Sequence, residues 1–484
     1  MAAILAAVAL AAATSANAAD LGKDVADVRA KYAADIERLS NWCKANGLAD
    51  EARRTRCVLG PNDRYKLFIA VLPEQVGPPA LPADAPAKAT EWDSQLWRVR
   101  RDQAAKLYEL ARRAAHEGRV SVAIELARWA LEANPDCEPA RRLFGYQKVG
   151  DQWRTAYEAR KLRSGFVWSD QFGWLPKTSL PRYERGERLC DGRWISAAED
   201  ARRHADIRTG WKVETEHYAI RTDLGIEAAV ALGVKLESLQ RIWQQLFVRY
   251  YATNAEVVAM FEGRSRSKLN ALPRHAIVYF RDREEYARQL RPTMPQVDRT
   301  TGVYRDDPPC AYFFAGEGAS QRDVYHEATH QLFYESRAVS PDLVRRENFW
   351  VVEGIALFME SLRREDGFWV LGGVDDERMR AARYRLLHDN FYVPLEQLIA
   401  FDMKKLQQDP RIAMLYSQSA GLTHFLAFDG GSRYRDALVA YLVAVYSGRA
   451  GRDTLAKLTG QSDAELDRQY RTFVEAGRAE AKND

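Results

Sequence analysis

The stretch SQRDVYHEATHQLFYE, Ser320 to Glu335, contains two of the chain's eight histidines, four residues apart, with a glutamate directly after the first. Residues at positions i and i+4 of an α-helix lie on one face, about one turn apart. A helix here would therefore direct His326 and His330 toward a single metal ion. Glu327 would lie about 100° further around the helix. At that angle its carboxylate is no ligand, but it can take a proton from water on the ion.

Two local patterns predict that this stretch is a helix. Ser320, three residues before Asp323, is typical of an N-cap followed by its capping partner. Val324, Ala328 and Leu332 form a stripe of small and apolar side chains that can be buried. The histidine spacing is thus expected to lie on a regular helix.

A catalytic zinc ion needs a third protein ligand and an open position. The stretch ENFWVVEGIALFMESLRRE, Glu347 to Glu365, predicts an amphipathic helix that supplies Glu353. Gly354 is expected to let this helix approach the first one closely. Two imidazoles and one carboxylate suit zinc better than magnesium or calcium, which prefer oxygen ligands. We therefore predict one Zn²⁺ per chain.

The segment YHEATHQLF, followed by FWVVEGIALFME, resembles the gluzincin metallopeptidases of the thermolysin-like superfamily. The closest pattern is the branch whose third ligand lies in a W-x-x-E-G-x-A context, and the resemblance covers about residues 211–471. It implies a zincin-like catalytic domain in which zinc is bound by His326, His330 and Glu353. It also implies that Glu327 acts as general base and then as acid.

The resemblance has further implications and one departure. It implies that CAYFFAG, residues 310–316, is the sheet edge on which a peptide substrate lies. Thermolysin-type enzymes carry an aspartate four residues after the third ligand, which orients a zinc histidine, and this chain has Leu357 there. We expect a backbone carbonyl or an acid such as Glu360 to orient the histidine instead.

The stretch LYSQSAGLTHFLAF, Leu415 to Phe428, resembles the Y-x-Q-S-x helix that follows the zinc helices in this branch. A neutral hydrogen-bond donor beside the metal stabilises the oxyanion that forms at the transition state. Tyr416 is the candidate donor and His424 the reserve. Both could instead be structural, since a tyrosine on a packed helix usually satisfies its hydroxyl within the fold.

From Trp211 the pattern changes to strand, long helix, strand, strand and helix. The segments EHYAIRTD and HAIVYFRD read as strands, and EAAVALGVKLESLQRIWQQLFVRYY has the helical period. We predict that residues 211–484 form the metallopeptidase domain, with a mixed sheet followed by a helical subdomain. The predicted fold class is therefore α+β, in a multidomain chain.

The preceding residues predict three further regions. Residues 19–90 read as a helical segment and a Pro/Ala linker, Glu74 to Ala89. Residues 91–148 resemble one tetratricopeptide repeat, in which Gly118 separates two helices and Pro135 stops the second. This region could bind a protein partner in a groove, or it could simply be a helical pair that packs on its neighbours.

Residues 149–210 contain two related tryptophan modules. GDQWRTAYEARK and DGRWISAAEDARR each have a tryptophan followed five residues later by a glutamate. We expect the indoles to be buried, because tryptophan is most often a large core residue. Stacking of carbohydrate on exposed tryptophans is the alternative.

The start of the chain is apolar, rich in alanine and ends in the A-x-A pattern Ala16-Asn17-Ala18. It predicts a secretory signal peptide, residues 1–18, with a membrane anchor as the alternative. No later segment reaches spanning length, so we expect a periplasmic or secreted protein without a membrane span in the mature chain. Cysteines can pair in that environment, and Cys43 with Cys57 is the first expectation.

Composition and motifs narrow the function. The net charge is +4, with 71 basic and 67 acidic side chains, so nucleic acid is not the expected partner. Nucleophile-elbow, P-loop and Rossmann glycine patterns are absent from the sequence. The sequence predicts a secreted zinc peptidase that acts on a peptide or protein. The alternative is a catalytically weak zincin scaffold that binds a partner through the repeat-like and tryptophan regions.

Overall fold

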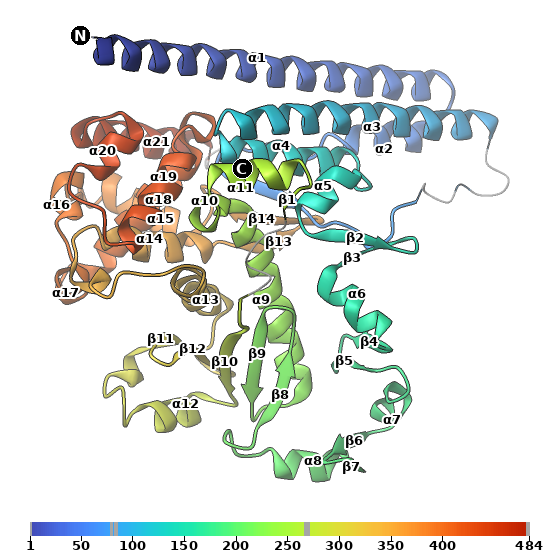
Figure 1. Cartoon of the computed structure of the whole chain (residues 1–484), viewed down its shortest axis with the longest axis vertical. Coiled ribbons are helices and arrows are strands. Elements are labelled where there is room, and N and C mark those ends of the chain that lie inside the picture. Colours follow the sequence, from blue (N-terminus) through green and yellow to red (C-terminus); the bar gives the residue numbers. More distant parts are fainter. Residues whose placement is uncertain (1, 78–80, 82–85, 266–271, 481–484) are drawn as a thin grey trace. The chain divides into compact units, whose positions relative to one another are not determined.

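The computed structural model describes residues 2–77, 81, 86–265 and 272–480. Helices and small sheets make up two compact units (Figure 1), which confirms the α+β, multidomain class. The finer boundaries after residues 18, 90, 148 and 210 stay predictions. The two units are, first, Met1–Asn62, Ile69–Ala156 and Ala252–Ser267 and, second, Asp63–Phe68, Tyr157–Tyr251 and Lys268–Asp484.

The first unit is largely helical. Helices α3 (Ala87–His116) and α4 (Val120–Ala133) lie side by side, which confirms the break at Gly118 and the stop before Pro135. Helix α3 begins inside the segment predicted as a linker, and most of the remaining linker lies outside the described residues. The likeness to a tetratricopeptide repeat and the signal peptide both stay predictions. Other elements of this unit are α1 (Ala2–Ala45), α2 (Ala49–Cys57), α5 (Glu138–Leu143), β2 (Tyr146–Val149), β3 (Gln152–Thr155) and α11 (Asn254–Phe261).

The expected disulfide between Cys43 and Cys57 is wrong. All five cysteines, which lie in the described part of the chain, are free thiols. Cys43 is buried and its thiol contacts Thr55 of α2. Cys57 lies two residues after Thr55, about 200° around the helix, and is exposed. The two sulfur atoms therefore point in different directions.

Residues 146–203 form three successive hairpin–helix modules, where the sequence indicated two. In the additional, middle module Trp174 is followed five residues later by Ser179, so the tryptophan–glutamate spacing does not reveal it. Trp153 of the first module is 2% exposed, as expected for a core residue, whereas Trp194 of the third module is only half-buried. The modules consist of β2, β3 and α6 (Ala156–Arg163), then β4 (Phe166–Ser169), β5 (Gly173–Pro176) and α7 (Leu180–Glu184), then β6 (Glu187–Cys190), β7 (Arg193–Ser196) and α8 (Ala197–Arg203).

The second unit is built around a mixed sheet, as expected, which has five strands in the order β11-β12-β10-β9-β8. The central strand β10 pairs in parallel with β9 and β12, and the outer strands β8 and β11 are antiparallel to their neighbours. The strands are β8 (Trp211–Glu214), β9 (Tyr218–Thr222), β10 (His275–Phe280), β11 (Val303–Asp306) and β12 (Pro309–Phe314).

The sheet edge is not the one implied by the family resemblance. The CAYFFAG segment forms β12, which lies inside the sheet between β10 and β11. The edge strand on this side of the sheet is β11, only four residues long and joined to β12 by a tight turn, with Asp306 opposite Pro309. Such a short strand has no periodicity of its own, so its pairing became evident only in the fold.

Helices complete the second unit. Helices α13 (Gln321–Glu335), α14 (Trp350–Met359) and α18 (Ile412–Ser432) carry the predicted site. The other elements described here are α9 (Ile226–Leu246), α10 (Val248–Tyr251), α12 (Arg283–Leu290), η2 (Val297–Arg299), η3 (Leu343–Arg345), α15 (Glu377–Leu387), α16 (Leu395–Ile399), α17 (Met403–Gln408), α19 (Arg435–Tyr446), α20 (Thr454–Thr459), α21 (Asp463–Glu480) and a second sheet of β1 (Lys66–Ala70), β14 (Phe368–Gly372) and β13 (Arg363–Glu365).

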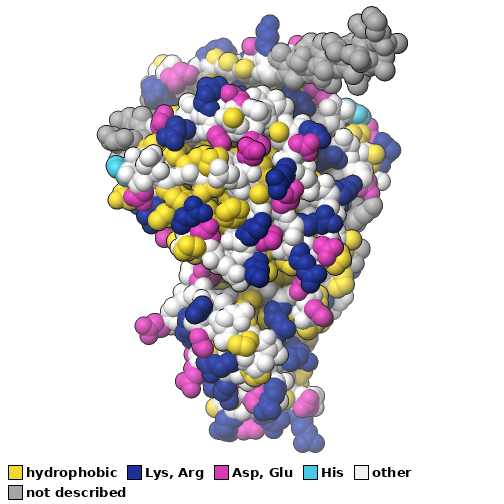
Figure 2. Space-filling model, turned by 90° about the vertical axis from the view of Figure 1, so that its left-hand side faces the viewer, with side chains coloured by type: hydrophobic (Ala, Val, Ile, Leu, Met, Phe, Trp, Pro, Cys, Tyr) yellow, Lys and Arg dark blue, Asp and Glu magenta, His cyan; other side chains and the backbone are white. Residues whose placement is uncertain are grey.

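Charged side chains of both signs are mixed over the face shown in Figure 2. This agrees with the nearly balanced composition of 71 basic and 67 acidic residues. In the part of the chain that is described, no helix combines the length and the apolar character needed to cross a membrane.

Candidate metal centre

Helix α13 begins where the sequence predicts. The Ser320 hydroxyl accepts a hydrogen bond from the backbone N–H of Arg322 at 3.1 Å, so Ser320 is the N-cap. Asp323 is not its capping partner, because its carboxyl group bonds to Thr301 instead. Ala328 and Leu332 are fully buried and anchor the helix in the core.

Helix α14 differs from its prediction in two respects. All ten of its residues are buried, so it is a core helix and the expected amphipathic pattern is wrong. Gly354 faces α18 rather than α13: a Cβ atom there would lie 2.5 Å from Thr423 Oγ1 and 2.8 Å from the Ser419 carbonyl oxygen. The glycine thus allows α14 and α18, not α13, to approach closely.

Three predicted ligands converge between α13 and α14. The Nε2 atoms of His326 and His330 are 3.1 Å apart, and Glu353 Oε2 lies 3.5 Å from the first and 3.9 Å from the second. Ligands at ordinary zinc distances in a tetrahedron are about 3.3 Å apart. In the described part of the chain, no other group of three His, Cys, Asp or Glu side chains converges within 4.8 Å.

Glu360 orients one of these histidines. Its Oε1 lies 2.9 Å from Nδ1 of His326, so the carboxylate holds the Nδ1 proton and turns Nε2 toward the other predicted ligands. Leu357, at the position where the thermolysin-type enzymes that the sequence resembles have an aspartate, is buried and takes no part. The acid that we expected to orient His326 is therefore Glu360, about one helical turn after Leu357.

Two arginines hold Glu360 in place. Arg378 Nε donates to Glu360 Oε2 at 2.9 Å, and Arg322 donates to the same oxygen at 3.3 Å. Arg322 also pairs with Asp376, the N-cap of α15, at 3.2 Å. Burial opposes ionisation of Glu360, but the hydrogen bonds from His326 and Arg378 lower its pKa to about 2. The acceptor of the His326 proton is thus a fixed negative charge.

Burial and neighbouring charges shift the pKa values of the other site residues. Burial and the facing His326 lower the pKa of His330 to about 4, so its imidazole is neutral, the form that binds metals. Burial alone would raise the pKa of Glu353, but its hydrogen bond with His326 and the nearby imidazoles lower it. Burial raises the pKa of Glu327, against the opposing effects of His326 and the Tyr304 N–H.

The edge strand β11 positions Glu327. The backbone N–H of Tyr304 donates to Glu327 Oε2 at 2.8 Å. Gly302, just before this strand, leaves room for the glutamate, because a Cβ atom there would lie 3.3 Å from Glu327 Cγ. The carboxylate is therefore held on the strand side of α13, off the cluster of the three predicted ligands.

The two candidate oxyanion donors differ. Tyr416 on α18 is half-buried, and its hydroxyl hydrogen-bonds to Glu353. Burial raises the pKa of the phenol, and the nearby carboxylate of Glu353 raises it further. His424 lies two turns later on α18 and is 1% exposed, with Nδ1 2.9 Å from the Ala420 carbonyl oxygen and its ring against Phe358. Of the two, Tyr416 is the one that lies at the cluster.

Sequence reasoning missed the contributions of Arg322, Arg378 and the Tyr304 backbone. The arginines lie far apart in sequence and follow no spacing, and a backbone N–H carries no side-chain signal. Only the pairing of β11 with β12 beside α13 could have indicated Tyr304.

The comparisons with known proteins add one match. The model of a protein family of unknown function, DUF1570, matches residues 321–448. The matched part runs from the start of α13 to just beyond α19 and includes all the predicted site residues. No curated protein matches the chain.

Proposed function

We propose that the chain is a zinc-dependent peptidase that hydrolyses peptide bonds in a peptide or protein, in the periplasm or outside the cell. The observation that carries the proposal is the convergence of His326 and His330 of α13 with Glu353 of α14, together with Glu327, which directly follows His326 and is held by β11. A purely structural cluster of the other three residues would not need this fourth residue, an acid that is held separately.

The donor set fits zinc. Two imidazole nitrogens and one carboxylate oxygen, 3.1 to 3.9 Å apart, match a tetrahedral site that keeps one position open. Bound zinc would act as a Lewis acid that polarises a scissile carbonyl and makes water more acidic. The His326–Glu360 contact supports this fit, because metal-binding histidines usually donate their other N–H to a carboxylate or carbonyl.

The roles of the chain's own residues follow from where they lie. Glu327 would accept a proton from the attacking water and donate it to the leaving amine. Tyr416 would donate a hydrogen bond to the oxyanion, which requires its hydroxyl to turn from Glu353 toward the substrate. The exposed edge of β11 could pair with an extended peptide and bring its backbone past Glu327.

The alternative, a zincin scaffold without activity, rested on Leu357. With Glu360 bonded to His326, the missing aspartate no longer argues for weak metal retention. The function that the geometry supports best is therefore hydrolysis.

The experiment is a comparison of wild type, Glu327→Gln and the exposed control Glu365→Gln on a peptide library, read by mass spectrometry. Glu327→Gln should keep the fold and one zinc but lose about a hundredfold to ten-thousandfold of the rate, because an amide cannot accept the proton. The control should match wild type. Equal residual activity in wild type and Glu327→Gln, or no cleavage by zinc-loaded wild type, would overturn the proposal.

A further inference from the structure

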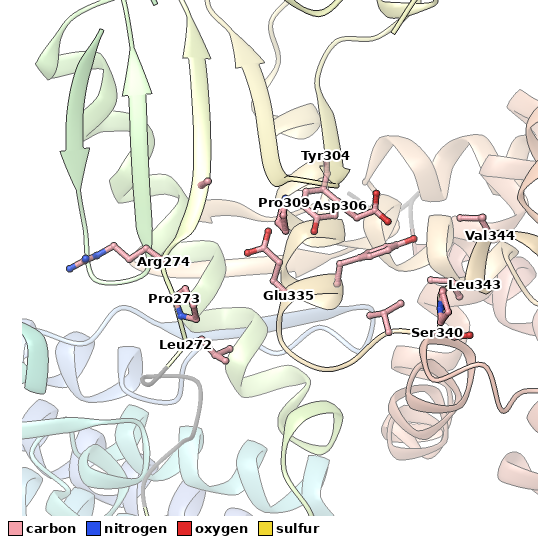
Figure 3. Close-up of a pocket in the computed structure, with 14 residues that line it drawn as sticks. Leu272, Pro273, Arg274, Tyr304, Asp306, Pro309, Glu335, Ser340, Leu343 and Val344 are labelled. Atoms are coloured by element: carbon pink, nitrogen blue, oxygen red, sulfur yellow. The ribbon is translucent and has the colours of Figure 1, made fainter. Parts of the chain in front are cut away.

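A cavity of about 620 Å³ is lined in part by residues of α13, the helix that carries His326 and His330 (Figure 3). It is bounded by the end of α13, the β11–β12 turn and the residues that lead into β10. Tyr334, in its wall, is one helical turn beyond His330 on the same face of α13. Tyr304, which holds Glu327 through its N–H, also lines the cavity. A substrate group near the metal could therefore extend directly into this space.

The walls combine apolar side chains with acids. Asp306 and Glu335 contribute carboxylates, and α13 ends here, so the negative end of the helix dipole adds to them. Tyr304 bonds to Glu335, and nearby Asp306 together with burial raises the pKa of both Tyr304 and Tyr334. The apolar part of the wall is formed by Leu272, Pro273, Val339, Pro341, Leu343 and Val344.

The nearest lining cation does not neutralise these acids. Arg274 Nε donates to the Thr215 carbonyl at 2.8 Å, and its Nη1 pairs with Glu214 at 3.2 Å. Figure 3 shows its guanidinium directed away from Tyr304, Asp306 and Glu335. Glu335 is paired with His275 at 2.6 Å. The carboxylate of Asp306 is exposed and has no ion pair within the described residues.

We propose that this cavity is a subsite for an organic cation of the substrate, a guanidinium or an ammonium, with Asp306 as the residue that selects it. The apolar wall would take the methylene groups of a basic side chain while its charged end meets the acids. The cation could be a basic side chain or a free terminal amine, since both present N–H donors and a positive charge. The inference rests on the proposed function for its place beside the cleaved bond, but not for the binding itself.

Binding can be measured without turnover. The probes are N-acetyl-arginine amide and N-acetyl-citrulline amide, which have nearly the same shape but differ in charge, titrated against zinc-loaded Glu327→Gln by ligand-observed NMR. The arginine probe should bind about fivefold more tightly, the upper range for an ion pair open to solvent. Adding Asp306→Asn should abolish the difference, and Asp306→Lys should reverse it. Asp307→Asn, which removes the same charge from the same turn outside the cavity, should leave it unchanged.

A second pair of probes separates the two sources of the cation. Norleucine amide carries a free amine and N-acetyl-norleucine amide does not. If the charged probe binds more tightly only in the norleucine pair, and this difference depends on Asp306, the cavity binds a terminal amine. If the Asp306-dependent difference appears only in the arginine pair, the cavity binds a basic side chain. Equal binding within both pairs, or a preference that survives Asp306→Asn, overturns the subsite.

The same variants in the cleavage assay keep the two proposals apart. If wild type cleaves peptides but the preference for a cation is insensitive to Asp306→Asn, the subsite is wrong and the peptidase stands. If the charged probes bind as expected but no peptide is cleaved, the subsite stands and the peptidase is wrong.

Discussion

Two of the histidine–glutamate pairs in the second unit share one geometry and differ in surroundings. Glu360 Oε1 lies 2.9 Å from Nδ1 of His326, and Glu237 Oε2 lies 2.7 Å from Nδ1 of His217. Nε2 of His326 faces a second imidazole and a carboxylate. Nε2 of His217 is buried without a hydrogen-bond partner among the described residues. A carboxylate on Nδ1 therefore fixes a tautomer but does not by itself make a metal site.

The partners of the two glutamates also differ. Glu237 accepts from Thr215 Oγ1 at 2.6 Å and from the His217 backbone N–H at 2.7 Å, and so ties the β8–β9 turn to α9. Glu360 is held by two arginines on other elements. Within the described part of the chain, Glu237 bonds only to the turn that contains His217, whereas Glu360 orients a histidine that belongs to the group of three predicted ligands. We expect substitutions to separate a structural role from a metal-binding one.

The largest difference should appear when each histidine is removed. His326→Ala should bind no zinc, because a single histidine and one carboxylate are left. His217→Ala should retain one zinc per chain, provided that it folds. Metal content after zinc loading and gel filtration, by mass spectrometry, checks both. Zinc retained by His326→Ala, or lost from folded His217→Ala, would contradict the comparison.

Glu353→Ala should weaken zinc binding by about a thousandfold or more, well beyond the effect of losing an outer contact. The carboxylate is 6% exposed and provides the third ligand atom. Competition with a chromogenic zinc chelator measures the affinity. A variant with the affinity of wild type would remove Glu353 from the coordination sphere and the gluzincin resemblance with it.

Glu237→Gln should lower the free energy of unfolding by about 3 kcal/mol, because it removes the charge that faces His217 and one of the two acceptor oxygens of a buried pair. Its zinc affinity should equal that of wild type. Urea denaturation followed by circular dichroism gives the first quantity, and the chelator competition gives the second. Weaker zinc binding here would show that the two pairs are coupled.

Glu360→Ala should weaken zinc binding by about tenfold to a hundredfold, since it removes only the group that orients His326. Arg378→Ala, which leaves Glu360 in place beside Arg322, should cost less. The same chelator titration ranks both variants against Glu353→Ala. A loss as large as that of Glu353→Ala would mean that Glu360 itself binds the metal.

The smallest effect concerns pH. Burial opposes charge on both members of the His217–Glu237 pair, but their hydrogen bond prevails, raising the pKa of His217 above 6.5 and lowering that of Glu237 below 4.5. The histidine contribution is complete below pH 6.5 and lost as pH rises through its folded value. The glutamate contribution is complete above pH 4.5 and lost as pH falls through its folded value. The stability gap between wild type and Glu237→Gln should thus peak between about pH 4.5 and 6.5, as urea titrations across pH would show.

The sequence was most informative where the chemistry repeats along one helix. Ser320 and the i, i+4 spacing of His326 and His330 predict α13 and its two ligands. The need for a third ligand, together with the W-x-x-E-G-x-A context, indicates Glu353, and the departure at Leu357 pointed to an acid such as Glu360. All four side chains lie where one ion could use them directly or through a neighbour.

Features that depend on pairing between distant segments were not predictable. Strand β11 has four residues, so its position at the sheet edge is fixed by hydrogen bonds to β12 rather than by a pattern. Helix α14 has Glu353 among apolar residues, which suggests one polar face, yet α13 and α18 cover it from different sides. Cys43 and Cys57 are near in sequence, but helix geometry points them apart.

Gly354 has a consequence for how the site tolerates change. The residue after Glu353 lets α14 lie so close to α18 that one added methyl group would meet the Ser419 carbonyl oxygen at 2.8 Å. Backbone cannot yield as a flexible side chain can, so Gly354→Ala would push the helices apart. Glu353 and Tyr416 sit on opposite sides of that contact. The spacing between the proposed metal ligand Glu353 and the proposed oxyanion donor Tyr416 thus depends on the missing side chain of Gly354, a residue that takes no part in the reaction itself.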